Sequence, residues 1–254
     1  MRLLSYNILD GGTGRADQLA DVIASQRPDL VAVVEAEDEA VLDHLARRLD
    51  MDVLFAAGNT HASALLTRWP VRESMNHAPL HKDLEKSFLE ATVVDPTGRA
   101  WTLGVLHLHA HGTEADEDQR LRELEIVLKA FSPHRAAGRP HLLCGDFNAN
   151  APYQLIDPAQ CKPRTQKEWQ QNGGGLPRRA VQKVLNEGYI DTLRAADPQA
   201  SETTGSFNTQ SPGQRVDYVF AHGFAPGQIQ RAWVERSGKA KDASDHYPVG
   251  VEML

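Results

Sequence analysis

Three short polar strings in the second half of this 254-residue chain constrain its fold, because each adjoins an apolar run typical of a strand. The strings are Gly145-Asp146-Phe147-Asn148, Arg215-Val216-Asp217-Tyr218 and Ser244-Asp245-His246. Each sets a carboxylate beside an amide, a base or a second carboxylate. Hard oxygen ligands and one histidine, gathered from several strand ends, are what Mg²⁺-assisted phosphoryl chemistry requires. The sequence therefore predicts a phosphoryl-transfer site built from the ends of several strands.

The composition predicts a substantial core and no membrane span. Hydrophobic residues make up 41% of the chain, and a chain of this length buries roughly 70–75% of its unfolded surface. No apolar run approaches the ~18 residues of a membrane helix, and the strand-like start at Met1 leads us to expect no signal peptide. Cys144 and Cys161 give no disulfide framework, so we expect a cytoplasmic protein. The net charge of −7 argues mildly against a protein that binds duplex DNA.

Periodicity along the chain alternates between strand and helix. Apolar runs predict strands over 3–8, 30–34, 53–57, 62–67, 88–94, 101–109, 141–144, 214–220, 229–234 and 247–253. Helical spacing predicts helices over 15–26, 39–49, 117–131 and 178–187. Residues 151–176 show no period and hold three consecutive glycines, which predicts a long loop or insertion. Hairpins mixed with αβ units favour an α/β (α+β) fold of two packed sheets with outer helices, in one domain over 1–254.

Asp146 and Asn148 lie two residues apart, so their side chains point the same way on an extended segment. The carboxylate would serve a metal or an attacking water, and the amide would donate to a phosphate oxygen. The alternative is an ordinary turn, because Gly-Asp-x-Asn is good turn chemistry. Their position directly after an apolar strand favours function.

His246 stands before a strand that begins at Pro248 or just after it, and a histidine there needs a partner that fixes its tautomer. Asp217 is the natural candidate. It lies among Val216, Tyr218 and Val219, where a buried carboxylate is costly unless it is paired. A surface ion pair between Arg215 and Asp217, beside an ordinary histidine, is the alternative.

Glu35 ends the apolar run 31–34, and Asn7 lies at a similar depth on the first strand. A carboxylate metal ligand, with an amide that holds it or a phosphate, is the functional interpretation. Glu35 could instead be an acidic residue in the first turn of a helix, and Glu37 is a second candidate ligand. Glu35 is preferred because it is nearer the strand.

His107, His109 and His111 alternate, so all three could face one side of a strand. An imidazole stabilises the negative charge that develops on a phosphorane, and we rank His107 first, then His109, then His111. The same three histidines could instead form the zinc site of a metallohydrolase. No clear further set of histidine ligands accompanies them, and that reading leaves Asp146 and Asn148 unexplained.

Together these segments resemble the endonuclease/exonuclease/phosphatase superfamily, which has the fold of deoxyribonuclease I and the abasic-site endonucleases. Gly145-Asp146-Phe147-Asn148 matches a superfamily motif letter for letter. The other matching segments, in chain order, are Tyr6-Asn7-Ile8, Val33-Val34-Glu35 (without the usual preceding Gln), His107-Leu108, Arg215-Val216-Asp217-Tyr218 and Ser244-Asp245-His246. The resemblance implies a four-layer αββα sandwich of two mixed sheets with outer helices, and a site where the sheets open.

The resemblance also implies roles for these residues in a metal-dependent hydrolase. Mg²⁺ or Mn²⁺ would be bound by Glu35, Asp245 and Asn7. Water would be activated by His246 with Asp217 and oriented by Asp146, which could instead assist the leaving group. The phosphate would be held by Asn7, Asn148, His107 and His246.

The expected activity is that of a phosphodiesterase or nuclease-type hydrolase, with a phosphomonoesterase or lipid phosphodiesterase as alternatives. Nucleic acid, a nucleotide or another small phosphoester is the expected partner of a monomer without a membrane anchor. A thin basic patch could serve a nuclease or could be a solvated loop. It comprises Lys162, Arg164, Lys167 and Trp169 in the insertion, with Arg178 and Arg179 just after it. A zinc enzyme or a non-catalytic binding module is less favoured.

Overall fold

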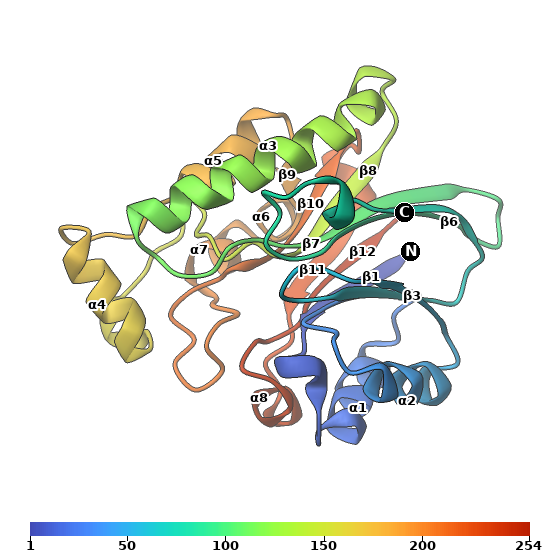
Figure 1. Cartoon of the computed structure of the whole chain (residues 1–254), viewed down its shortest axis with the longest axis horizontal. Helices are drawn as coiled ribbons and strands as arrows, with labels where there is room; N and C mark the ends of the chain where they lie inside the picture. The colour runs from blue at the N-terminus through green and yellow to red at the C-terminus, as the bar shows by residue number, and fades with distance from the viewer.

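The computed structural model describes residues 1–254, apart from the side chain of Pro226. Its centre is a pair of six-stranded mixed sheets (Figure 1). The first sheet has the order β11 (Ile229–Val234), β12 (Val249–Met253), β1 (Arg2–Asn7), β2 (Leu30–Val34), β4 (Ser63–Thr67) and β3 (Asp52–Ala56). The second has the order β5 (Val71–Asn76), β6 (Phe88–Val94), β7 (Ala100–His107), β8 (His141–Asp146), β10 (Asp217–His222) and β9 (Ile190–Asp191).

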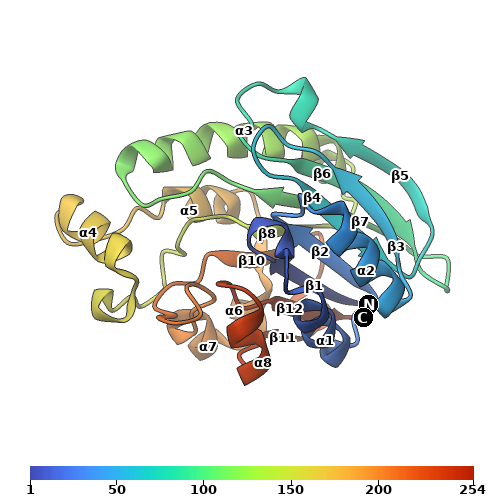
Figure 2. The ribbon, with the colours of Figure 1, turned by 60° about the horizontal axis from the view of Figure 1, so that its bottom comes forward.

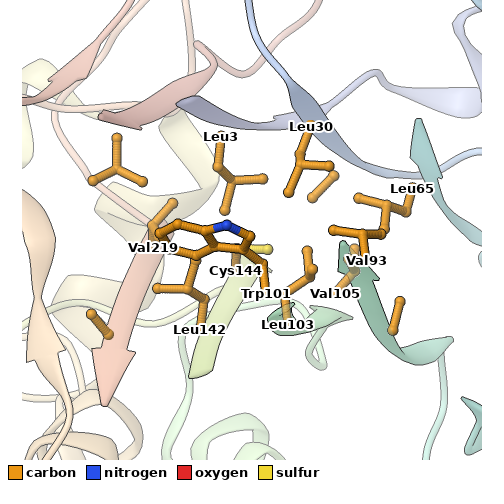
Figure 3. Close-up of a cluster of buried hydrophobic side chains, with 14 of the residues drawn as sticks. Leu3, Leu30, Leu65, Val93, Trp101, Leu103, Val105, Leu142, Cys144 and Val219 are labelled. Atoms are coloured by element: carbon orange, nitrogen blue, oxygen red, sulfur yellow. The ribbon is translucent and has the colours of Figure 1, made fainter. Parts of the chain in front are cut away.

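Apolar side chains from both sheets meet in a shared core between them (Figure 3). The first sheet contributes Leu3, Leu30 and Leu65, which face Leu103 and Leu142 of the second, and all are fully buried. Because both faces of these strands are covered, they read as continuous apolar runs in the sequence.

Helices cover the outer faces and complete four layers (Figure 2). Apolar stripes of α1 (Ala16–Gln26), α2 (Glu39–Leu49) and α8 (Gly238–Ala243) pack on the first sheet. Those of α3 (Glu114–Ala136) and α5 (Arg179–Asn186) pack on the second. The remaining helices are α4 (Pro163–Gln171), α6 (Thr192–Ala196) and α7 (Pro198–Thr203). The expected αββα sandwich is confirmed. Among the described residues, no helix has the length and apolar character needed to cross a membrane.

Strand direction gathers the polar residues at one edge of the sandwich. In the second sheet, β7 runs parallel to β8 and β10 runs antiparallel to it, so His107, Asp146 and Asp217 are register partners in one row. In the first sheet, β1 and β2 run parallel and end at Asn7 and Val34, which are also register partners. Strand β12 pairs antiparallel with β1, so the segment before Val249 lies near the end of β1.

Several elements differ from those expected. Residues 151–176 were predicted to be a loop but include α4, which lacks an apolar stripe and buries only Thr165 and Glu168. Strand β5 escaped prediction because its side chains are mostly exposed, and α6, α7 and α8 are too short to show a period. Strand β7 ends at His107, two residues earlier than predicted, and β10 covers 217–222 in place of 214–220.

Candidate active site

A pocket of about 360 Å³ opens where the two sheets end, and residues of both sheets line it. Four of the expected site residues that line it are Glu35, Asp146, Asp245 and His246. Glu35 has φ 57° and Asn148, also in the lining, has φ 47°. Non-glycine residues rarely adopt such left-handed backbone conformations, and the strain they carry clusters at functional sites.

His246 and Asp217 form the expected pair. The Nδ1 atom of His246 lies 2.9 Å from Oδ2 of Asp217, and both side chains are buried. Ser206 donates its hydroxyl to the same carboxylate oxygen at 2.6 Å. The Nε2 atom of His246 lies 3.8 Å from Oδ2 of Asp146. Burial lowers the pKa of His246, but the charges of Asp217 and Asp146 outweigh it and raise that pKa to about 10.

Asp146 lies at the centre of the site and is only 1% exposed. Its Oδ1 accepts the backbone N–H of Asn148 at 2.8 Å, and its Oδ2 accepts Nδ2 of Asn7 at 3.2 Å. The Nε2 atom of His107 is 3.4 Å from Oδ2. Burial raises the pKa of Asp146 to about 6, so this carboxyl group can hold a proton close to neutral pH.

The backbone at position 145, directly before Asp146, requires a glycine. Its φ is +136°, and a Cβ atom there would lie 1.8 Å from the carbonyl oxygen of Leu106 on β7. No side chain can occupy that space. The close approach of β7 and β8 therefore requires glycine at the position that delivers Asp146 to the site.

Glu35 and Asp245 provide the oxygen atoms best suited to a divalent cation. Asn7 donates Nδ2 to Oε1 of Glu35 at 2.9 Å, and the backbone N–H of Asp10 donates to Oε2 at 2.9 Å. Among the described residues, the buried Oδ1 of Asp245 has no hydrogen-bond partner, and burial raises the pKa of this carboxyl group. An orphaned carboxylate oxygen beside an oriented carboxylate is a donor set suited to Mg²⁺ or Mn²⁺.

The neighbouring Glu37 is engaged elsewhere. It accepts from Nδ1 of His61 at 2.8 Å and from the backbone N–H of Ala62 at 2.9 Å. Of the two glutamates that the sequence leaves open, Glu35 lines the pocket and Glu37 does not.

A second possible ligand group consists of Asp146, Asp217 and His246, whose candidate ligand atoms all lie within 4.8 Å of one another. Asp217 and the Nδ1 atom of His246 already bond to each other. This bond occupies two of the atoms that the group could offer to a cation, whereas Oδ1 of Asp245 has no hydrogen-bond partner among the described residues.

His107 carries a partner that the sequence analysis missed. The ammonium of Lys86 lies 2.8 Å from Nε2 of His107 and donates to the carbonyl of Leu108 at 2.9 Å. Burial, then the charge of Lys86, holds the pKa of His107 well below its usual range, so the imidazole accepts from Lys86 as a neutral group. Lys86 precedes β6, which pairs antiparallel with β7, and this strand-start position is the signal that could have revealed it.

The three histidines do not converge as a zinc site would require. His109 contacts Glu85 and lies 3.1 Å from Oδ1 of Asp116, whereas His111 lies beyond the end of β7 with φ 76° and lines the pocket. The expectation of one shared strand face is wrong, because β7 ends at His107.

The residues of the basic patch do not act as one surface. Arg178 donates to the carbonyls of Ala151 and Gln154, and Arg179 pairs with carboxylates of α3, so both are engaged outside the pocket. Lys162 and Arg164 line the pocket instead. Asn148 also lines it, and donates Nδ2 to the carbonyl of Leu108 at 3.0 Å.

Comparison with known proteins agrees with this geometry. The model of the Endonuclease/Exonuclease/phosphatase family matches residues 4–246. The chain belongs to this family. Its members are phosphoester hydrolases, so the expectation of an enzyme of that class is confirmed.

Solved structures similar to this family member share its fold at low sequence identity. The 3′ phosphatase NExo from Neisseria, bound to a product DNA hairpin, has a TM-score of 0.74 at 19% identity over 100% of this chain and 99% of that one. An AP endonuclease from Archaeoglobus fulgidus has a TM-score of 0.71 at 16% identity, with the same coverage. The mannosyl-6-phosphatase Bt3783 from Bacteroides thetaiotaomicron has a TM-score of 0.69 at 18% identity, again over 100% and 99%.

Proposed function

We propose that this family member is a divalent-metal-dependent hydrolase that directs water at phosphorus in a single in-line displacement. The observation that carries the proposal is the buried His246–Asp217 pair, whose free Nε2 atom faces Asp146 inside a pocket with metal-binding carboxylates. Asp217 fixes the imidazole tautomer with the proton on Nδ1, which leaves Nε2 to accept a proton from water. The negative neighbours that raise the pKa of His246 make it a stronger base, which must lose its own proton before it can act.

The other residues supply position and charge. Bound Mg²⁺ or Mn²⁺, held by Glu35 and Asp245 with Asn7 beside them, would neutralise charge on the phosphate and the leaving oxygen. Asn148, which lines the pocket, would hold a phosphate oxygen, and His107 accepts from Lys86 and so keeps a cation nearby. Asp146 orients the water or protonates the leaving oxygen, and its raised pKa suits the second role.

Among phosphoesters, the pocket favours a small one. A volume of about 360 Å³ lies at the lower end of the ~300–1,000 Å³ that is usual for small-molecule sites. The net charge of −7 also argues against duplex DNA. Phosphodiester cleavage, which we expect from the sequence, and phosphomonoester cleavage both remain compatible with these residues.

The test compares four substrates: bis(p-nitrophenyl) phosphate, p-nitrophenyl phosphate, a plasmid and a single-stranded oligonucleotide. Each is incubated with the wild type and with His246→Ala, in Mg²⁺, in Mn²⁺ and after chelation with EDTA. We expect metal-dependent turnover of at least one small ester, and its loss by a factor of about 10²–10⁴ in His246→Ala. Turnover that survives the loss of His246 would refute the proposed base.

A further inference from the structure

Helix α4 forms one wall of the pocket and is fixed at both ends. At its start, Thr165 donates its hydroxyl to Oε1 of Gln214 at 2.9 Å, and both side chains are buried. Just past its end, Asn172 donates Nδ2 to the carbonyl of Gly112 at 2.6 Å. In Figure 1 the helix stands at one end of the molecule, away from the two sheets. These bonds hold an otherwise peripheral helix against the site.

Lys162, directly before α4, is a cation in this wall without an anionic partner. It lines the pocket and is half-buried, and its ammonium makes neither a hydrogen bond nor an ion pair among the described residues. Its Nζ atom lies 4.1 Å from the ring centre of Phe207. That ring centre is 4.4 Å from the ring centre of His246, so Phe207 packs against both the ammonium and the proposed base. A partly buried charge is costly when it is unpaired, so this position favours an anionic ligand.

Arg164 extends the same cationic surface. Its Nε atom donates to Oε1 of Glu168 at 3.0 Å, while its side chain is 56% exposed and lines the pocket. In the part of the chain that the structure describes, the two Nη atoms of Arg164 make no ion pair. They are therefore free to bind a carboxylate or a phosphate.

The pocket is lined by both acidic and basic side chains. Glu35, Asp146 and Asp245 suit the reacting phosphate with its cation, and Lys162 and Arg164 add positive charge from the α4 wall. Glu168 of α4 also lines the pocket, but its carboxylate is paired with Nε of Arg164 and leaves the ammonium of Lys162 without a partner. We propose that Lys162 and Arg164 form a subsite for a second anionic group, so that the substrate is a small phosphoester with an additional phosphate or carboxylate. This inference rests on the proposed function and specifies its substrate class.

Two matched pairs of substrates test the subsite, and the separation between the two anionic groups differs between the pairs. One pair is glycerol 3-phosphate and 3-phosphoglycerate, which differ by a carboxylate, and the other is fructose 6-phosphate and fructose 1,6-bisphosphate. Phosphate release is measured with Mg²⁺ for the wild type and for Lys162→Met, which keeps an aliphatic side chain against Phe207 and removes the charge. In at least one pair, kcat/KM should favour the doubly anionic ester by about 10- to 100-fold. In Lys162→Met the ratio of the two kcat/KM values should fall toward one.

The matched control is Lys167→Met, which removes the same charge from an exposed position of α4 outside the pocket. It should keep the wild-type preference. A loss of the preference in both variants would assign it to the general charge of α4 and overturn the subsite.

The p-nitrophenyl esters, assayed in parallel, separate failure of the subsite from failure of the proposed function. Their metal-dependent hydrolysis, without any preference for a doubly anionic ester, would overturn the subsite and leave the function standing. Preferred cleavage of an oligonucleotide, lost in Lys162→Met, would assign these cations to nucleic acid and also overturn it.

If no ester is turned over, calorimetric titration of 3-phosphoglycerate and glycerol 3-phosphate still tests the subsite through binding. Tighter binding of 3-phosphoglycerate by the wild type than by Lys162→Met supports the subsite. Equal binding of the two ligands by both proteins overturns it.

Discussion

Replacement of Asp217 by Asn tests the proposed base through its partner. The carboxylate accepts from Nδ1 of His246 at 2.9 Å and from the hydroxyl of Ser206 at 2.6 Å, and it is only 1% exposed. An amide at this position keeps the size and one acceptor oxygen but removes the charge. If the amide nitrogen faces Nδ1 of His246, the imidazole proton moves to Nε2, and the atom that should accept a proton from water is blocked.

The size of the effect follows from the loss of general-base catalysis. Such catalysis contributes about 10²–10⁴ in rate, equivalent to about 3–5 kcal/mol of barrier. Because the tautomer of His246 decides whether it can act, Asp217→Asn should lose most of this factor in kcat. Ser206→Ala is the matched control, because it removes the other hydrogen bond to the same oxygen and leaves the charge. It should cost no more than about tenfold.

The assay is a double-mutant cycle in kcat with Asp217→Asn, His246→Ala and the double variant, each checked for folding by circular dichroism. If Asp217 acts only through His246, the double variant is no slower than His246→Ala alone. Multiplicative losses would contradict an action of Asp217 through His246 alone. They would show that Asp217 acts independently, for instance as a metal ligand in the group that it forms with Asp146 and His246.

Three further predictions concern metal binding, the histidines and stability. Glu35→Gln should raise the Mg²⁺ concentration for half-maximal activity by more than about tenfold, because loss of a ligand costs at least as much as loss of its supporting partner. Glu37→Gln, whose carboxylate bonds to His61, should change it less than about twofold. His107→Ala should lower kcat/KM by at least about tenfold because Lys86 loses its acceptor, whereas His109→Ala should cost less than about threefold. Finally, burial lowers the pKa of His141 to about 4. The unfolded chain therefore takes up a proton below pH ~6.5 that the folded chain cannot, and about 2 kcal/mol of unfolding free energy should be lost between pH 7 and pH 5. His141→Gln should remove that part of the pH dependence, measured by urea unfolding.

A specific result would contradict each of these three predictions. An equal shift in the Mg²⁺ concentration for half-maximal activity in Glu35→Gln and Glu37→Gln would contradict the preference for Glu35 as the metal ligand. A larger loss from His109→Ala than from His107→Ala would place the site histidine outside the pocket. An unchanged pH slope in His141→Gln would mean that Nε2 of His141, which accepts from the hydroxyl of Tyr189 at 2.8 Å, is not held neutral by the fold.

The strand ends were predictable because their signals are local. A carboxylate directly after a buried apolar run, as at Glu35 and Asp146, indicates the carboxyl end of a strand. Parallel neighbouring strands bring their carboxyl ends to the same edge of the sheet. The pairing of Asp217 with His246 was also predictable, since a buried aspartate requires a partner. Helix α4 was not, because its anchors, such as the bond from Thr165 to Gln214, join residues far apart in the chain.

Lys86 shows the same limit at the level of one side chain. A lysine before a strand is usually a solvated charge, so its position becomes a signal only together with the pairing of β6 with β7, which places it 2.8 Å from His107. The order of the three histidines was also beyond the sequence, because strand β7 ends at the first of them. Where function depends on which strand is the neighbour, local pattern carries little information.

The most direct test of the account is the rate of p-nitrophenol release from bis(p-nitrophenyl) phosphate and p-nitrophenyl phosphate by the wild type and Asp146→Ala, with Mg²⁺ or Mn²⁺ and after EDTA. We predict that at least one ester is hydrolysed, that EDTA abolishes the reaction, that added metal restores it, and that Asp146→Ala loses it. Hydrolysis that persists in EDTA or in Asp146→Ala would contradict the account, because the reaction would then take place without the residues that define this pocket.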